Sequence, residues 1–179
     1  MMTFKLHIAA FVSLMTLSAA SAEPFVDVQP ITTLGGDATR VSALIEIEAS
    51  PAAVWAVLTD CTRAPNVIPH LESCRIIDKD PAGRWDIREH IINPPLLPRI
   101  RTLVRNDFQA PRRLAFKLQG GDMRVSDGFW ALQPVSRGTR LTYEAVIAPK
   151  FAAPQFLITR AMAQDFPAML KAIERASVP

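Results

Sequence analysis

The chain has 179 residues, with 20 lysines and arginines against 17 aspartates and glutamates. A formal net charge of +3, without a basic run that carries interleaved aromatic residues, gives no support for nucleic-acid binding. The length is that of one domain with a substantial hydrophobic core, which needs neither structural metals nor many cross-links to be stable.

The first 22 residues have the pattern of an export signal. Lys5 precedes an apolar run over residues 8–17, and small residues at 20–22 follow at the spacing of a cleavage site. The apolar run is shorter than the roughly 20 residues that span a bilayer, so an uncleaved membrane anchor is the less favoured alternative. We expect a signal peptide over residues 1–22, cleaved after Ala22, and a protein exported to a compartment such as the bacterial periplasm.

Two cysteines, Cys61 and Cys74, are separated by 12 residues. Exported proteins meet an oxidising environment, so a disulfide between them is expected, worth on the order of 3 kcal/mol in restrained chain entropy. A metal site is the alternative, but the histidines lie far away in the sequence and give no ligand spacing. A catalytic dithiol favours a two-residue gap, which this pair lacks. We therefore expect a structural bridge and no metal.

Residues 23–37 contain two prolines and a Gly-Gly pair and are expected to form an extended arm. Apolar and polar residues then alternate over 38–49, which predicts a strand. Ser50 and Pro51 are typical of a helix start, because serine caps free amides and proline at the first position loses no hydrogen bond. A helix over 51–59 is predicted, followed by at most a short helical piece between two prolines.

The rest of the chain predicts an antiparallel meander and a final helix. Short turns rich in glycine and proline separate the strand patterns, and no long crossover occurs between them. With the strand over 38–49 the sheet has about seven strands. The later strand patterns cover residues 71–79, 84–93, 100–109, 112–119, 122–135 and 139–148. The segment 155–177 has the apolar period of a helix that lies on a sheet, interrupted at Pro167. The predicted class is α+β.

One strand, 84–92, carries the most informative alternation. The set expected to face the core is Trp85, Ile87, Glu89 and Ile91, and the set expected to face outward is Asp86, Arg88 and His90. A carboxylate among apolar neighbours has a raised pKa and is a candidate ligand contact or general acid. The alternative is that Glu89 pairs with an arginine or reaches solvent at a strand end.

A curved sheet with one long helix across it can leave an interior pocket for a hydrophobic ligand. Trp130 and Tyr143 are the residues most expected to line it, because their polar edges need partners. The complete set of candidate ligand-binding residues is Trp85, Ile87, Glu89, Val104, Phe116, Trp130, Tyr143, Met162 and Phe166.

Recognisable catalytic motifs are missing from the sequence. There is no Gly-x-Ser-x-Gly elbow, phosphate-binding loop or His-Glu-x-x-His helix, and nothing predicts a cofactor. Glu89 and Tyr143 are the only candidates for an acid/base pair. The sequence therefore makes no positive case for an enzyme.

Several segments together resemble a known superfamily. They are the helix start Ser50–Asp60 with the prolines that follow it, the strand segment Gly128–Leu132 and the strand segment Gly138–Tyr143. They are similar to the START-like, or Bet v 1-like (SRPBCC), helix-grip superfamily, and most similar to its polyketide cyclase/dehydrase and coenzyme-Q-binding groups. The resemblance covers roughly residues 38–177, although an export signal is atypical of the coenzyme-Q-binding group.

The resemblance implies a helix-grip fold, with a curved antiparallel sheet, two short helices after the first strand and a long C-terminal helix over the sheet. It also implies a ligand cavity between the sheet and that helix, gated by residues 94–98 and 151–156. Proteins of this fold include carriers, cyclases and interaction modules, so the fold alone does not decide the function.

Two functions follow as expectations. The first is an exported protein that binds and carries a hydrophobic small molecule or lipid, with transient contact to a membrane surface. The second is a cyclase or dehydratase acting on a hydrophobic substrate in the same cavity, with Glu89 and Tyr143 as acid and base. An interaction module without a ligand is a third, weaker expectation.

Overall fold

The computed structural model describes residues 23–33 and 35–178, so the predicted signal peptide lies outside the described residues. Within these ranges the strands are β1 (Phe25–Thr33), β2 (Gly36–Ile47), β3 (Leu71–Lys79), β4 (Trp85–Ile92), β5 (Ile100–Gln109), β6 (Arg113–Gly121), β7 (Met123–Val135) and β8 (Gly138–Pro149). The helices are α1 (Pro51–Thr59), α2 (Ala64–Val67) and α3 (Gln155–Ser177).

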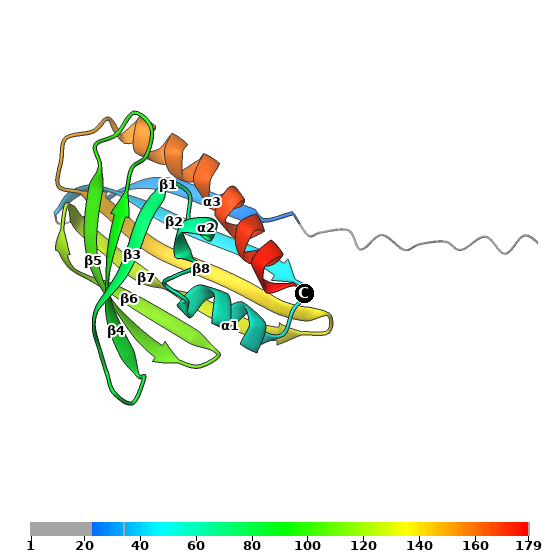
Figure 1. Ribbon diagram of the computed structural model, residues 1–179. Coiled ribbons are helices and arrows are strands. Elements are labelled where there is room, and N and C mark those ends of the chain that lie inside the picture. The colour runs from blue at the N-terminus through cyan, green and yellow to red at the C-terminus, as the bar shows by residue number, and fades with distance from the viewer. Residues whose placement is uncertain (1–22, 34, 179) are drawn as a thin grey trace, which may run out of the picture.

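The described strands form one antiparallel sheet in the order β1-β2-β8-β7-β6-β5-β4-β3. The sheet is strongly curved and unclosed, and α3 lies across its inner side (Figure 1). The predicted α+β helix-grip architecture is therefore confirmed. The strand count is eight instead of about seven, because part of the expected extended arm forms β1. This strand pairs with β2, from Phe25 opposite Leu44 to Thr33 opposite Gly36.

The start of α1 follows the predicted chemistry. The Ser50 side chain accepts a hydrogen bond from the Ala53 amide at 3.2 Å, and Pro51 occupies the first turn. Val54 and Val57 on this helix are buried. The chain then forms the single turn α2 and enters β3, and the predicted disulfide joins Cys61 to Cys74 with their Cα atoms 5.4 Å apart. The bridge ties the end of α1 to the edge strand of the sheet.

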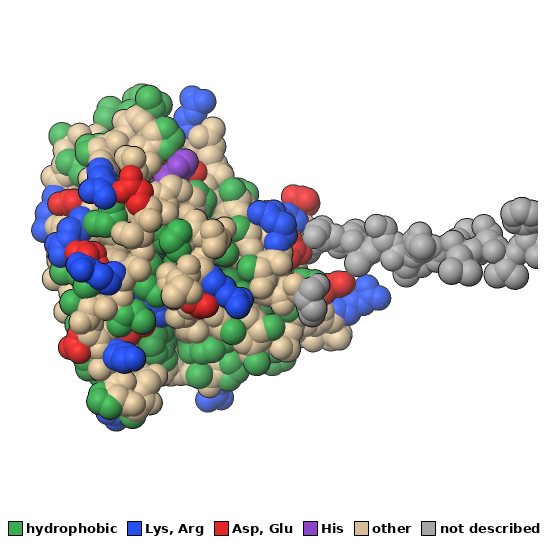
Figure 2. All heavy atoms as spheres, viewed as in Figure 1, with side chains coloured by type: hydrophobic (Ala, Val, Ile, Leu, Met, Phe, Trp, Pro, Cys, Tyr) green, Lys and Arg blue, Asp and Glu red, His purple; other side chains and the backbone are tan. Residues whose placement is uncertain are grey.

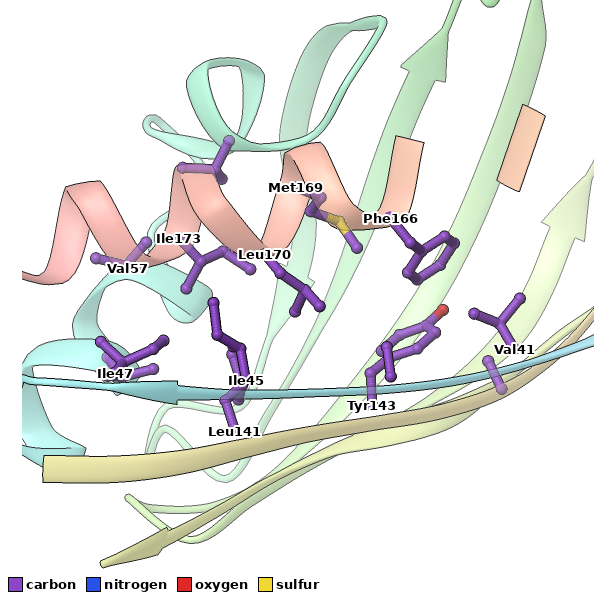
Figure 3. Packing of buried hydrophobic residues seen from close by; sticks show 14 of the residues in the cluster. Val41, Ile45, Ile47, Val57, Leu141, Tyr143, Phe166, Met169, Leu170 and Ile173 are labelled. Atoms are coloured by element: carbon purple, nitrogen blue, oxygen red, sulfur yellow. The ribbon is translucent and has the colours of Figure 1, made fainter. Parts of the chain in front are cut away.

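The core lies between α3 and the strands on one side of the sheet. Figure 3 shows Phe166, Met169, Leu170 and Ile173 of α3 pointing down onto side chains of β2 and β8. The sequence predicts that Pro167 kinks or splits this helix. The helix runs from Gln155 to Ser177 with Pro167 inside it, so the proline does not split it. None of the helices in the described part of the chain combines the length and the apolar character needed to cross a membrane.

Candidate ligand-binding site

The long helix covers only one half of the inner face of the sheet. It packs mainly on β1, β2, α1 and α2, while β3 to β6 curve away from it (Figure 1). In the uncovered half, apolar side chains of β5, β6 and β7 face inward but keep part of their surface exposed. Met162 of α3 and the buried Tyr143 and Phe166 border these side chains under the helix. We call the whole set the inner apolar surface: Ile100, Phe116, Leu118, Trp130, Tyr143, Met162 and Phe166.

Pairing across the strands shows that these side chains share one face. Phe116 lies opposite Asn106 and Gly128, and Trp130 lies opposite Leu114 and Tyr143. Paired residues in an antiparallel sheet point to the same side, so the apolar side chains of three strands are continuous.

An aromatic cluster closes the end of this surface that lies under α3. The Tyr143 ring is 4.5 Å from the Trp130 ring, 4.9 Å from the Phe166 ring and 5.8 Å from the Phe116 ring, between centroids. Burial raises the pKa of the Tyr143 hydroxyl, so the group stays protonated at any physiological pH. The described residues give the Tyr143 hydroxyl no hydrogen-bond partner, but its oxygen is not fully enclosed, so a ligand oxygen could bond it.

The face assignment predicted for β4 is wrong. Asp86 and Arg88 are each only 5% exposed and lie on the inner side, where Arg88 pairs with Val104 across the sheet. Trp85 and Ile87 lie on the outer side, and the Arg105 guanidinium stacks 4.4 Å from the Trp85 ring centroid. These two residues and Glu89 therefore do not face the inner apolar surface, contrary to the expectation from alternation.

The polar residues of β4 can face inward because other elements satisfy their charges. The Arg88 guanidinium donates to Asp86 at 2.8 Å and to the backbone carbonyl of Thr59, at the end of α1, at 2.8 Å. Asp86 also accepts a hydrogen bond of 2.7 Å from the Asn106 amide on β5. A buried charge is tolerated when it is paired and hydrogen-bonded in this way.

Glu89 is a surface ion-pair residue. Its carboxylate lies 2.6 Å from the Arg101 guanidinium and 2.7 Å from that of Arg75, and the hydrogen bonds from these two arginines lower its pKa. The expectation of a raised pKa is wrong, and the alternative of pairing with an arginine is correct. Glu89 and Tyr143 lie on opposite faces of the sheet, so they cannot act together on one substrate.

His90 also faces inward, opposite Thr102 on β5 and Cys74 on β3. Burial, and then the positive charge of Arg88, lower its pKa from 6.5 to about 4, so the imidazole is neutral at neutral pH. With its neighbours on β4 and β5 it forms what we call the inner polar cluster, made up of Asp86, Arg88, His90, Thr102 and Asn106. This cluster was not predicted from the sequence. Polar residues at alternating positions of both β4 and β5 were a signal that could have indicated it.

A separate depression of about 420 Å³ lies on the surface between α2 and the end of α3. It carries two arginines and no aromatic residue, so it is less suited to a hydrophobic ligand than the inner apolar surface. Its lining residues are Arg63, Asn66, Val67, Ala172, Arg175 and Ala176.

The fold and the apolar inner face define a helix-grip protein of the START-like class. Residues 47–174 match the family described as polyketide cyclase / dehydrase and lipid transport, and this match spans most of the chain. The protein belongs to that family, which confirms the resemblance inferred from the sequence. A search of curated proteins found none that matches.

Solved structures share the fold at low sequence identity. A STAR-related lipid transfer protein of Xanthomonas axonopodis is 15% identical with a TM-score of 0.72, over 90% of this chain and 97% of the other. A START superfamily protein of Mycobacterium smegmatis is 17% identical with a TM-score of 0.66, over 76% and 94%. The Zhui aromatase/cyclase of a Streptomyces species is 14% identical with a TM-score of 0.61, over 77% and 90%.

Proposed function

We propose that this protein binds and carries a hydrophobic small molecule or lipid on its inner apolar surface, in a cavity between the sheet and α3. One observation carries the proposal. Side chains such as Phe116, Leu118 and Trp130 face the inside of the grip and still keep exposed surface. Covering apolar surface is favourable by about 2.5 kcal/mol per 100 Å², so a ligand that fills the space there is stabilised.

The comparisons support a carrier in two ways. The family description includes lipid transport, and one structural neighbour is a lipid transfer protein. A cyclase or dehydratase is the other function within the family. The acid/base pair expected for it, Glu89 with Tyr143, is divided between the two faces of the sheet, so we do not build the proposal on it.

Two exposed apolar residues mark the place where a ligand would enter. Leu96, in the loop before β5, is 89% exposed, and Phe156, at the start of α3, is 68% exposed. Apolar side chains gather at this end of the molecule in Figure 2, beside the start of α3. The loops 94–98 and 151–156 would act as gates, and their apolar tips would contact a membrane surface transiently during loading.

Export is part of the proposal. The leader pattern of residues 1–22 and the disulfide of the folded domain both suit an oxidising compartment such as the periplasm. Cell fractionation tests this directly. Recovery of the cleaved protein, beginning at Glu23, from the periplasmic fraction supports export, whereas uncleaved protein in the cytoplasm contradicts it.

The test of binding uses native mass spectrometry and lipid extraction of protein purified from its own cells. We expect a bound hydrophobic species that survives purification. The matched variants are Leu118→Trp, which fills the inner apolar surface, and Lys117→Trp, which adds the same side chain on the outer face of the same strand. Loss of the bound species in the first variant only supports the site. Wild-type protein that is consistently empty would count against the carrier.

A further inference from the structure

The most unusual atom in the described part of the protein is Nε2 of His90. It is fully buried and has no hydrogen-bond partner, unlike every other buried side-chain nitrogen or oxygen among residues 23–33 and 35–178. Buried polar groups are nearly always satisfied, and one that is not needs an explanation, such as a partner that comes from a ligand. His90 lies on the inner face, where the proposed ligand would be.

The residues around His90 are polar, and the two charged ones, Arg88 and Asp86, neutralise each other. Arg88 is paired with Asp86, and it also donates to the backbone carbonyls of Leu58 and Thr59 on α1. Asp86 in turn accepts from Asn106. Across the strands, Thr102 on β5 and the disulfide-bonded Cys74 on β3 are uncharged. An anion placed here would find Arg88, the charged residue that acts most strongly on His90, already paired with Asp86.

The inner polar cluster adjoins the inner apolar surface directly. Arg88 lies opposite Val104, and Val104 lies opposite Leu118. A ligand whose body covers Leu118 and Trp130 could therefore place one end beside His90.

We infer that His90 hydrogen-bonds the single uncharged polar group, a hydroxyl or carbonyl oxygen, of an otherwise apolar ligand. This inference rests on the proposed function and names the ligand class: an alcohol, ketone or similar neutral amphiphile. Neutral imidazole suits either group, because one ring nitrogen donates and the other accepts.

The test measures the affinity of the protein for three ten-carbon probes at pH 7.5, with tryptophan emission as the signal. The probes are 1-decanol, 1-fluorodecane and decanoate. We expect the wild type to bind 1-decanol about 5-fold more tightly than 1-fluorodecane, the usual value of one hydrogen bond, and decanoate more weakly than 1-decanol. His90→Phe should remove the preference for 1-decanol, and His90→Gln, which keeps hydrogen-bonding atoms, should retain part of it. His70→Asn is the control, because asparagine tolerates the positive φ of this position, and it should keep the preference for 1-decanol.

A spectroscopic readout separates ligand contact from a structural role. The sequence from Glu23 onward contains only two histidines, so ¹⁵N-histidine labelling resolves both rings. 1-Decanol should shift the ring-nitrogen signals of His90 and leave those of His70 unchanged. Tightest binding of decanoate, or an unchanged 1-decanol preference in a folded His90→Phe variant, would overturn the inference.

The outcomes also separate this inference from the proposed function. If the wild type binds 1-decanol and 1-fluorodecane equally well, the carrier stands and the role of His90 is wrong. If it binds none of the three probes, both proposals fail.

Discussion

The imidazole of His90 links folding to protonation. Its pKa is about 4 in the folded protein against 6.5 for an ordinary histidine. Below pH 6.5 the unfolded chain takes up a proton that the folded protein does not, so this contribution to stability is complete above pH 6.5 and is lost as the pH falls toward 4. At pH 5 the loss is on the order of 2 kcal/mol.

Urea unfolding at pH 7.5 and pH 5.0 measures this effect. The wild type should lose more stability between the two pH values than His90→Phe does, because the variant lacks the titrating group while the carboxylates are common to both. Equal losses would show that His90 is not held neutral by burial.

Arg88 gives a second prediction at the scale of a residue. Arg88→Met leaves the buried Asp86 carboxylate without its partner, which should lower the free energy of unfolding by about 3 to 5 kcal/mol. The control is Arg101→Met on the outer face, where the arginine side chain is 48% exposed and the loss should stay under about 1 kcal/mol. Chemical denaturation measures the free energy of unfolding of both variants. Similar losses of stability in Arg88→Met and Arg101→Met would contradict the burial of the Asp86–Arg88 pair.

At the scale of elements, the disulfide fixes the end of α1 against β3. Replacing both Cys61 and Cys74 with serine should cost about 2 to 4 kcal/mol in the free energy of unfolding. Thermal and urea unfolding with and without a reducing agent provide the control. Reduction should destabilise the wild type by a similar amount and leave the double-serine variant unchanged. A wild type that is insensitive to complete reduction would contradict a stabilising bridge.

Sequence patterns predicted most of these elements correctly. The strands β3 and β5, the capped start of α1 and the range of α3 agree with the expected segments. Each of these depends on local signals, such as period, caps and turn residues. The pairing of β1 was missed because the prolines of residues 23–37 indicate an extended arm, whereas proline is tolerated on an edge strand such as β1.

The face of β4 could not be decided by alternation alone. Period two sorts side chains into two sets but does not say which set faces inward, and choosing the wrong set exchanges every residue. Apolar Trp85 and Ile87 favoured one choice. The structure takes the other, because α1 presents carbonyl groups that satisfy Arg88 from a distant part of the sequence. The inward-facing side of the sheet was therefore predicted correctly on β5 to β8 and incorrectly on β4, while ligand binding by these residues stays a prediction.

The whole molecule is asymmetric in how its sheet is covered. One half of the inner face carries α3 and a closed core, while the other half carries apolar side chains that are only partly buried. A polar cluster with an unsatisfied histidine borders the second half. This division between a stable half and an accessible half is the physical basis of the proposed ligand site.

The most direct test of this account locates the ligand with a single tryptophan. Two variants are made: Trp130 alone, with the other two tryptophans changed to phenylalanine, and Trp85 alone, prepared in the same way. Methyl stearate carrying a nitroxide on its chain quenches nearby indole fluorescence. We expect saturable quenching of Trp130 and only weak, non-saturating quenching of Trp85, since these residues lie on the inner and outer faces of the sheet. Equal quenching of both, or stronger quenching of Trp85, would contradict binding on the inner apolar surface.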